Sequence, residues 1–162
     1  MKKIFIFLVQ IIACFILQAQ NNYFKPGYST LFDSSKGDIL LHQSRSMPRI
    51  TRFWNATNKE NNFLEKNFKK VLAINSSFCE AGDCKVASLT KFVYQYIGVF
   101  YQGKRFIYVN AFSFIPEIHL NSKFGLWETG PVSVRDGENS FWGVLFDPEK
   151  QEFVQLSFNG ES

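Results

Sequence analysis

The chain has 162 residues, of which 18 are Lys or Arg and 14 are Asp or Glu, so its formal net charge is +4. Two of the lysines, Lys2 and Lys3, lie in a predicted signal peptide, and without them the charge is 16 − 14 = +2. So small an excess gives no reason to expect nucleic acid or an anionic surface as the partner, and the remaining length fits one domain.

The amino terminus is typical of an export signal. Two lysines precede an apolar stretch from Ile4 to Leu17, and polar residues follow Ala19. A basic start, an apolar core shorter than the roughly 20 residues of a membrane span, and a small residue before a polar stretch together predict a signal peptide over residues 1–19. We therefore expect an exported chain, periplasmic or secreted, with no membrane span after cleavage.

Two alternatives remain open for this terminus. One is a retained anchor helix. The other is a lipid anchor through Cys14, because Ile11-Ile12-Ala13-Cys14 resembles a bacterial lipobox. The apolar residues continue past this cysteine, however, whereas a lipoprotein usually turns polar there. We therefore favour the cleaved signal peptide.

Residues 20–55 predict an extended N-terminal segment. Ser, Gly, Asn, Pro and aromatic residues alternate there without a sustained period. Residues Asp38 to Gln43 fit a short strand or a single helical turn, and their length does not decide between the two. Farther along, Arg45, Arg49 and Arg52 come close to two aromatic residues. This stretch is either a solvated connector or a basic and aromatic surface for an acidic ligand.

One amphipathic helix is the clearest local prediction. Thr57 and Glu60 have the spacing of a capping box, in which the two side chains satisfy free backbone donors at a helix start. Apolar residues then recur at helical spacing, while lysines take the other face. The sequence predicts a helix from about Asn58 to Ile74. Its apolar residues include Leu64, Phe68, Val71 and Leu72.

A disulfide is expected in the loop after the helix. If Cys14 leaves with the signal peptide, Cys79 and Cys84 remain as an even pair around a Gly-containing loop. In an oxidising compartment, such a pair is expected to be bonded. A metal site would need two more Cys or His nearby, and His42 and His119 are distant in the sequence. We expect neither a metal nor another cofactor.

Two antiparallel hairpins are predicted, over Lys91 to Phe114 and Ser140 to Phe158. Each joins two aromatic and β-branched runs through a polar turn, and the turns contain Gly103 and Asp147-Pro148. Val132 to Val134 is a further short strand candidate.

The fold class predicted from these elements is α+β. One long amphipathic helix would pack on an antiparallel sheet of four to five strands, built from sequential hairpins, within a domain over residues 56–162. A doubly wound fold would need helices between the strands, and none is predicted there.

Several short motifs follow one another in order along the chain: Trp54 before a capped helix with Glu60, Leu64-Glu65 and Phe68 to Lys70, then Tyr94 to Gly98, Gly103 to Arg105 and Tyr108 to Phe112, then Asp136-Gly137, Phe141 to Val144, Phe146-Asp147 and Leu156 to Gly160. With these residues the chain resembles a group of small exported bacterial proteins of uncharacterised function. The resemblance covers most of the chain after the signal peptide and implies a helix packed on an antiparallel sheet, similar to cystatin-like or nuclear-transport-factor-like α+β folds. It implies no activity.

The sequence favours a binding role without catalysis. No nucleophile elbow is present. Paired carboxylates exist, such as Asp136 with Glu138 and Asp147 with Glu149, but both pairs lie in predicted turns, where Asp and Glu are common for backbone reasons. We expect a binding or inhibitory module for a protein or peptide partner in the cell envelope. Phe124 and Trp127, in the long segment from Ser113 to Gly130, are the first candidates for partner contact, since aromatic residues concentrate binding energy. The second candidates are Arg45, Arg49 and Arg52.

The alternative is a small-ligand-binding or enzymatic domain. It would have a cavity between the helix and the sheet, lined by aromatic residues with a few polar groups. The residues expected to line it are Tyr94, Tyr96, Phe106, Tyr108 and Trp142.

Overall fold

The computed structural model describes residues 24–46, 48–76, 85–115, 123–134 and 137–160, with the side chains of 123–125 left out. The signal peptide and Cys14 lie outside these residues, as do Cys79 and Cys84. Export, lipid anchoring and the disulfide therefore stay predictions.

The described residues form six strands, two short α-helices and several 3-10 turns. In chain order the elements are β1 (Ser29–Leu31), η1 (Ser34–Lys36), α2 (Gly37–Leu40), β2 (Ile50–Trp54), α3 (Asn58–Asn67), η2 (Phe68–Ala73), β3 (Phe92–Tyr101), β4 (Lys104–Ser113), η3 (Lys123–Glu128), η4 (Glu138–Ser140), β5 (Phe141–Asp147) and β6 (Glu152–Phe158).

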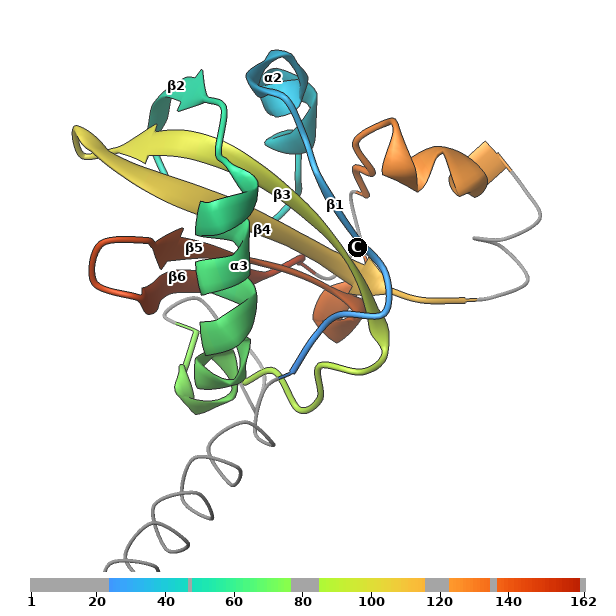
Figure 1. The fold of residues 1–162 in the computed structure, drawn as a ribbon. Helices are drawn as coiled ribbons and strands as arrows, with labels where there is room; N and C mark the ends of the chain where they lie inside the picture. Colours follow the sequence, from blue (N-terminus) through green and yellow to red (C-terminus); the bar gives the residue numbers. More distant parts are fainter. Residues whose placement is uncertain (1–23, 47, 77–84, 116–122, 135–136, 161–162) are drawn as a thin grey trace, which may run out of the picture.

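All six strands belong to one sheet, and α3 with η2 crosses one of its faces (Figure 1). The order is β1-β3-β4-β5-β6, and β2 also pairs with β3. Two strands thus share one edge of β3: β1 runs parallel to it along Tyr94 to Tyr96, and β2 runs antiparallel to it along Gly98 to Tyr101.

The expectation of a purely antiparallel sheet with four to five strands is wrong. The sheet has six strands and is mixed, because β1 pairs in parallel with β3. Backbone bonds from Phe32 N to Tyr96 O and from Tyr94 N to Tyr28 O fix this pairing. A strand of three residues is too short to show an alternating pattern, so it left no signal in the sequence. Residues from the predicted N-terminal segment therefore lie in the same sheet as the two hairpins.

The two predicted hairpins form, with ten register pairs between β3 and β4 and a bulged pairing between β5 and β6. The ambiguous stretch after η1 is the helical turn α2. Val132 to Val134, in contrast, is not a strand.

The capping box at the start of α3 is confirmed. Thr57 Oγ1 accepts from Glu60 N, and Glu60 Oε2 accepts from Thr57 N at 2.8 Å. The regular α-helix is shorter than predicted, because it changes to the 3-10 helix η2 after Asn67. The Asn67 side chain there donates to Phe63 O at 2.9 Å, and such side-chain bonds compete with the helical ladder.

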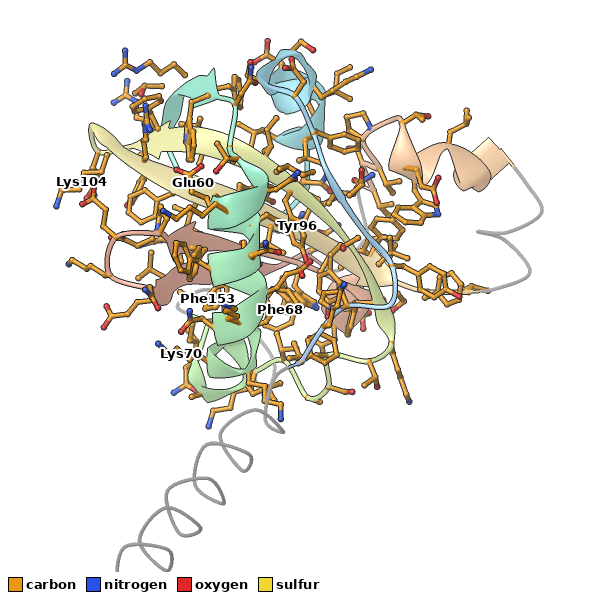
Figure 2. The ribbon with its side chains drawn as sticks, viewed as in Figure 1. Glu60, Phe68, Lys70, Tyr96, Lys104 and Phe153 are labelled. Carbon is orange, nitrogen blue, oxygen red and sulfur yellow. The ribbon has the colours of Figure 1, made fainter. Side chains whose placement is uncertain are left out.

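The sheet buries side chains on both faces. On the helix side, Phe68 lies between helix and sheet, with ring centroids 5.8 Å from Phe153 and 6.3 Å from Tyr96 (Figure 2). On the far side, Leu40 of α2 covers a second apolar cluster. Its buried members are Phe32, Leu40, Ile97, Val99, Phe106, Tyr108 and Leu145. A third, smaller cluster is built on Val93, Phe112 and Trp127.

Candidate binding surface

The far face of the sheet contains a buried polar cluster around Arg45. Its side chain is 4% exposed and donates from Nε to Tyr108 Oη at 3.0 Å, from Nη1 to Asn159 Oδ1 at 2.9 Å, and from Nη2 to Asn110 Oδ1. Within the described ranges, no carboxylate forms an ion pair with this guanidinium. Arg45 therefore links the N-terminal segment to the sheet and to the last described residues, and it shares no surface patch with Arg49 and Arg52, which are exposed.

Two amide side chains of the sheet hold the segment after η3. Gln95 Nε2 donates to Trp127 O at 2.7 Å and to Gly130 O at 2.9 Å, while its Oε1 accepts from Val132 N at 2.9 Å. Asn110 Nδ2 donates to Val132 O at 2.9 Å. The backbone groups of Val132 thus bond to side chains, which explains why the predicted short strand does not form there.

Trp127 belongs to the core of the described chain. Its side chain is 6% exposed and packs with Val93 and Phe112, and Tyr28 meets its ring edge to face at 6.3 Å. It therefore anchors the segment that carries it. Phe124 lies in η3, and its side chain is not described.

The five aromatic residues proposed to line a cavity lie on both faces of the sheet. Tyr94, Tyr96 and Trp142 belong to the helix-side core, whereas Phe106 and Tyr108 belong to the far side. They therefore cannot line one cavity between helix and sheet.

A hollow of about 280 Å³ is found instead where the two hairpin turns meet. It is bordered by Lys104 and Lys150 as well as Asp147 and Glu152. The Asp147 carboxylate accepts from the backbone N of Glu149 and Lys150 at 2.9 and 3.0 Å, so it caps the turn. The mixture of charges on this border favours no single class of ligand.

The arrangement with the clearest chemistry is a pair of exposed arginines on aromatic rings, at the end of the helix side of the sheet. Phe100 of β3 lies opposite Arg52 of β2 on one side and opposite Arg105 of β4 on the other. Paired residues of neighbouring strands share a face. The Arg52 Cζ lies 3.9 Å from the Phe100 ring centroid, and the Arg105 Cζ lies 4.8 Å from that of Trp54. We call these four residues the cationic surface.

Trp54 is a fixed platform within this surface. Its ring lies against Gly98, where an added Cβ would come within 2.8 Å of the indole and clash with Trp54 O. Its Nε1 donates to Val99 O and to Phe106 O, both at 3.1 Å. Because a buried indole with a satisfied N–H has little freedom, Arg105 stacks on a rigid support.

Neither guanidinium is neutralised by the protein in the part of the chain that the structure describes. No carboxylate there forms an ion pair with Arg52 or Arg105, and no acceptor takes a hydrogen bond from either side chain. Glu60, in the first turn of α3, is occupied within its own helix start, because its Oε2 accepts from Thr57 N and Thr57 Oγ1, both at 2.8 Å. Figure 2 places Glu60 at the start of α3 and Lys104 at the turn between β3 and β4.

The cationic surface can therefore bind carboxylates. A guanidinium is planar because its electrons are delocalised, and its N–H groups form a rigid fork that matches the two oxygens of a carboxylate. The charge is permanent, since arginine does not lose its proton in proteins.

Arg52 was a candidate from the sequence, and Trp54 is one of the two aromatic residues in the stretch interpreted as a possible basic and aromatic surface. Arg105 and Phe100 were not assigned to a site. Counting back from the turn at Gln102 and Gly103 would have placed Arg105 opposite Phe100. The pairing of β2 with β3 depends on residues far apart in the chain and left no such signal.

Two further properties bear on the class of protein. Among the described residues, no group of three or more His, Cys, Asp or Glu could hold a metal ion. None of the helices described is both long and apolar enough to cross a membrane.

No match of this chain to a protein-family model, to a curated protein or to a solved structure reached significance. The resemblance to cystatin-like or nuclear-transport-factor-like proteins therefore stays a prediction.

Proposed function

We propose that this protein is a non-catalytic binding module that holds an acidic segment of a protein or peptide partner on its cationic surface. One observation carries the proposal: Arg52 and Arg105 are exposed and stacked on Phe100 and Trp54. Their N–H groups have no protein acceptor in the described ranges. The predicted signal peptide would deliver the module to the cell envelope, so the partner is expected there.

Stacking makes these arginines better suited to binding than freely moving surface charges. An unrestrained arginine loses about 2 kcal/mol of rotamer freedom when a partner fixes it. A side chain that already lies on a ring has lost part of that freedom before the partner arrives. Arg and Trp are also among the residue types that contribute most to interfaces.

The size of the effect can be bounded. An exposed ion pair contributes about 0.2–1 kcal/mol, so the two arginines together contribute at most about 2 kcal/mol. Within this bound, a loss of about 1.4 kcal/mol weakens binding tenfold in Kd. Binding through these charges should also weaken as salt is added.

The test is fluorescence anisotropy with a labelled, extended peptide that carries Glu at alternate positions. We expect wild type to bind it, and Arg52→Gln/Arg105→Gln to bind about tenfold more weakly. The matched control is Lys25→Gln/Lys66→Gln, which removes the same charge from two exposed lysines outside the cationic surface. Circular dichroism checks that both variants fold.

The proposal would be overturned if wild type does not bind the peptide. Equal weakening in both double variants would also overturn it, because the effect would then come from net charge alone.

A further inference from the structure

The outer edge of β2 lies beside the cationic surface and has no strand partner in the described ranges. η1 and α2 approach the C-terminal end of β2, where Ser34 N donates to Asn55 Oδ1 at 2.8 Å and Gly37 lies against the Phe53 ring. β2 pairs with β3 on its inner side, and within the described ranges its backbone pairs with no other strand. Figure 1 shows β2 at the margin of the sheet, near the turn between β3 and β4. An exposed strand edge presents unpaired N–H and C=O groups and is a template for an added strand.

The other edges of the sheet are less suited to this. In β6, Gln155 has φ 59°, and the pairing shifts between Gly143 and Leu145, so a bulge interrupts that edge. β1 has three residues only. In β2, pairing shifts once, between Ile50 and Arg52, and then runs regularly to Trp54.

The positive charge at the edge of β2 indicates which kind of strand could bind there. Arg49 and Arg52 are exposed at this edge, so a second copy of β2 added there would bring like charges together, which is unfavourable between paired strands. An acidic strand would instead place opposite charges face to face. The edge is therefore repulsive to its own copies and attractive to an acidic segment.

We infer that the partner binds by strand addition: an extended acidic segment pairs with the outer edge of β2, with a Glu or Asp opposite Arg52. This inference rests on the proposed function and specifies how the partner binds. Directly opposed residues share a face of the sheet, so that carboxylate would lie on the same side as the Arg52 guanidinium. Arg105, which lies two strands farther inward, attracts the segment over a longer distance.

N-methylation of the peptide tests the inference. In a strand, alternate backbone N–H groups point to opposite edges, so an added strand uses only one alternate set for pairing. The same Glu peptide is made in two forms, each N-methylated at one alternate set of residues away from the label. We expect one form to bind at least about tenfold more weakly than the parent peptide and the other to bind like the parent.

Single variants give a second readout on the parent peptide. Arg52→Gln should weaken binding more than Arg105→Gln, because only Arg52 would face a carboxylate directly. Amide hydrogen exchange should also slow in β2 when the peptide is bound, while the edge strand β6 serves as the internal control.

Strand addition would be overturned if both N-methylated forms bind equally, whether as tightly as the parent or equally weakly. In either case, the proposed function would still hold if Arg52→Gln/Arg105→Gln binds the parent peptide more weakly than wild type does. If the parent peptide does not bind at all, the proposed function itself fails.

Discussion

At the scale of single residues, two strand glycines leave room for large polar and aromatic side chains. Gly98 admits the Trp54 ring on the helix side of the sheet, and Gly143 admits Arg45 and Tyr108 on the far side. At both glycines, a neighbouring side chain occupies the space that a Cβ would take. A strand glycine usually weakens a sheet slightly, so alanine would normally stabilise it. Here steric contact reverses that expectation.

Gly143→Ala should destabilise the protein. An added Cβ would lie 2.5 Å from Tyr108 Oη and 2.8 Å from Arg45 Nε, and these two atoms form a buried hydrogen bond of 3.0 Å. We expect the free energy of unfolding to fall by about 2 to 3 kcal/mol in urea titrations. Gly160→Ala is the control, since nothing lies within 4 Å of its added Cβ. Equal stability of the two variants would contradict a packed contact at Gly143.

The arginines show which properties of single residues a local sequence pattern can predict and which it cannot. Arg45 and Arg52 are seven positions apart and look alike in the sequence, yet Arg45 is 4% exposed and Arg52 is exposed. Their environments depend on partners far along the chain, since Asn159 meets Arg45 and Phe100 meets Arg52. A local pattern cannot contain that information, so the three arginines could be proposed together but not separated.

At the scale of elements, side chains of the sheet hold the segment from Trp127 to Val134 in place. They take the role that backbone hydrogen bonds play between paired strands. Gln95 and Asn110 come from the middle of β3 and β4 and are register partners. Asn110 Nδ2 donates to Gln95 Oε1 at 3.1 Å, which orients both amides toward the segment. The two hairpins and the capped helix could be predicted because their signals are local. This segment could not, because amides in a strand do not reveal what they bond.

Gln95→Leu should release this segment while the sheet stays folded. The substitution keeps a side chain of similar size but removes the partners of Trp127 O, Gly130 O and Val132 N. We expect the free energy of unfolding to fall by about 1 to 3 kcal/mol, because buried polar groups lose their partners. The amide of Val132 should exchange with solvent at least about tenfold faster, as expected for local opening.

Amides elsewhere in the same Gln95→Leu sample are the control for local release of this segment. Amides that form the hydrogen bonds between β5 and β6 should keep their protection after correction for global stability. Unchanged exchange at Val132 would show that Gln95 does not hold the segment.

At the scale of the whole molecule, the N-terminal segment completes the sheet. β1 and β2 lie end to end along β3, one parallel and one antiparallel, and they cover almost the whole of its outer edge. The net charge of the chain is small, but the arginines of β2 and β4 meet at one end of the sheet. The net charge of the whole sequence therefore does not indicate this local concentration of positive charge, which becomes apparent only from the order of the strands.

The buried tyrosines make the stability of the whole molecule sensitive to alkaline pH. Burial raises the pKa of Tyr94, whose hydroxyl donates to Leu89 O at 2.6 Å. Burial also raises the pKa of Tyr108, and Arg45 opposes this only in part. In the unfolded chain both hydroxyls ionise near pH 10. Their contribution to stability is therefore fully present below about pH 10 and is lost as pH rises through the folded-state pKa.

We expect the free energy of unfolding to fall above about pH 10, with each buried tyrosine adding up to about 1.4 kcal/mol per pH unit to the slope. Tyr94→Phe should lower stability by about 1 kcal/mol at neutral pH, because Leu89 O loses its donor. The same variant should lose stability less steeply at alkaline pH, so the difference from wild type should shrink as pH rises. Urea titrations from about pH 8 to about pH 11 measure both quantities. A Tyr94→Phe curve that runs parallel to wild type over this range would show that this hydroxyl ionises equally in the folded and unfolded chains, contrary to its burial.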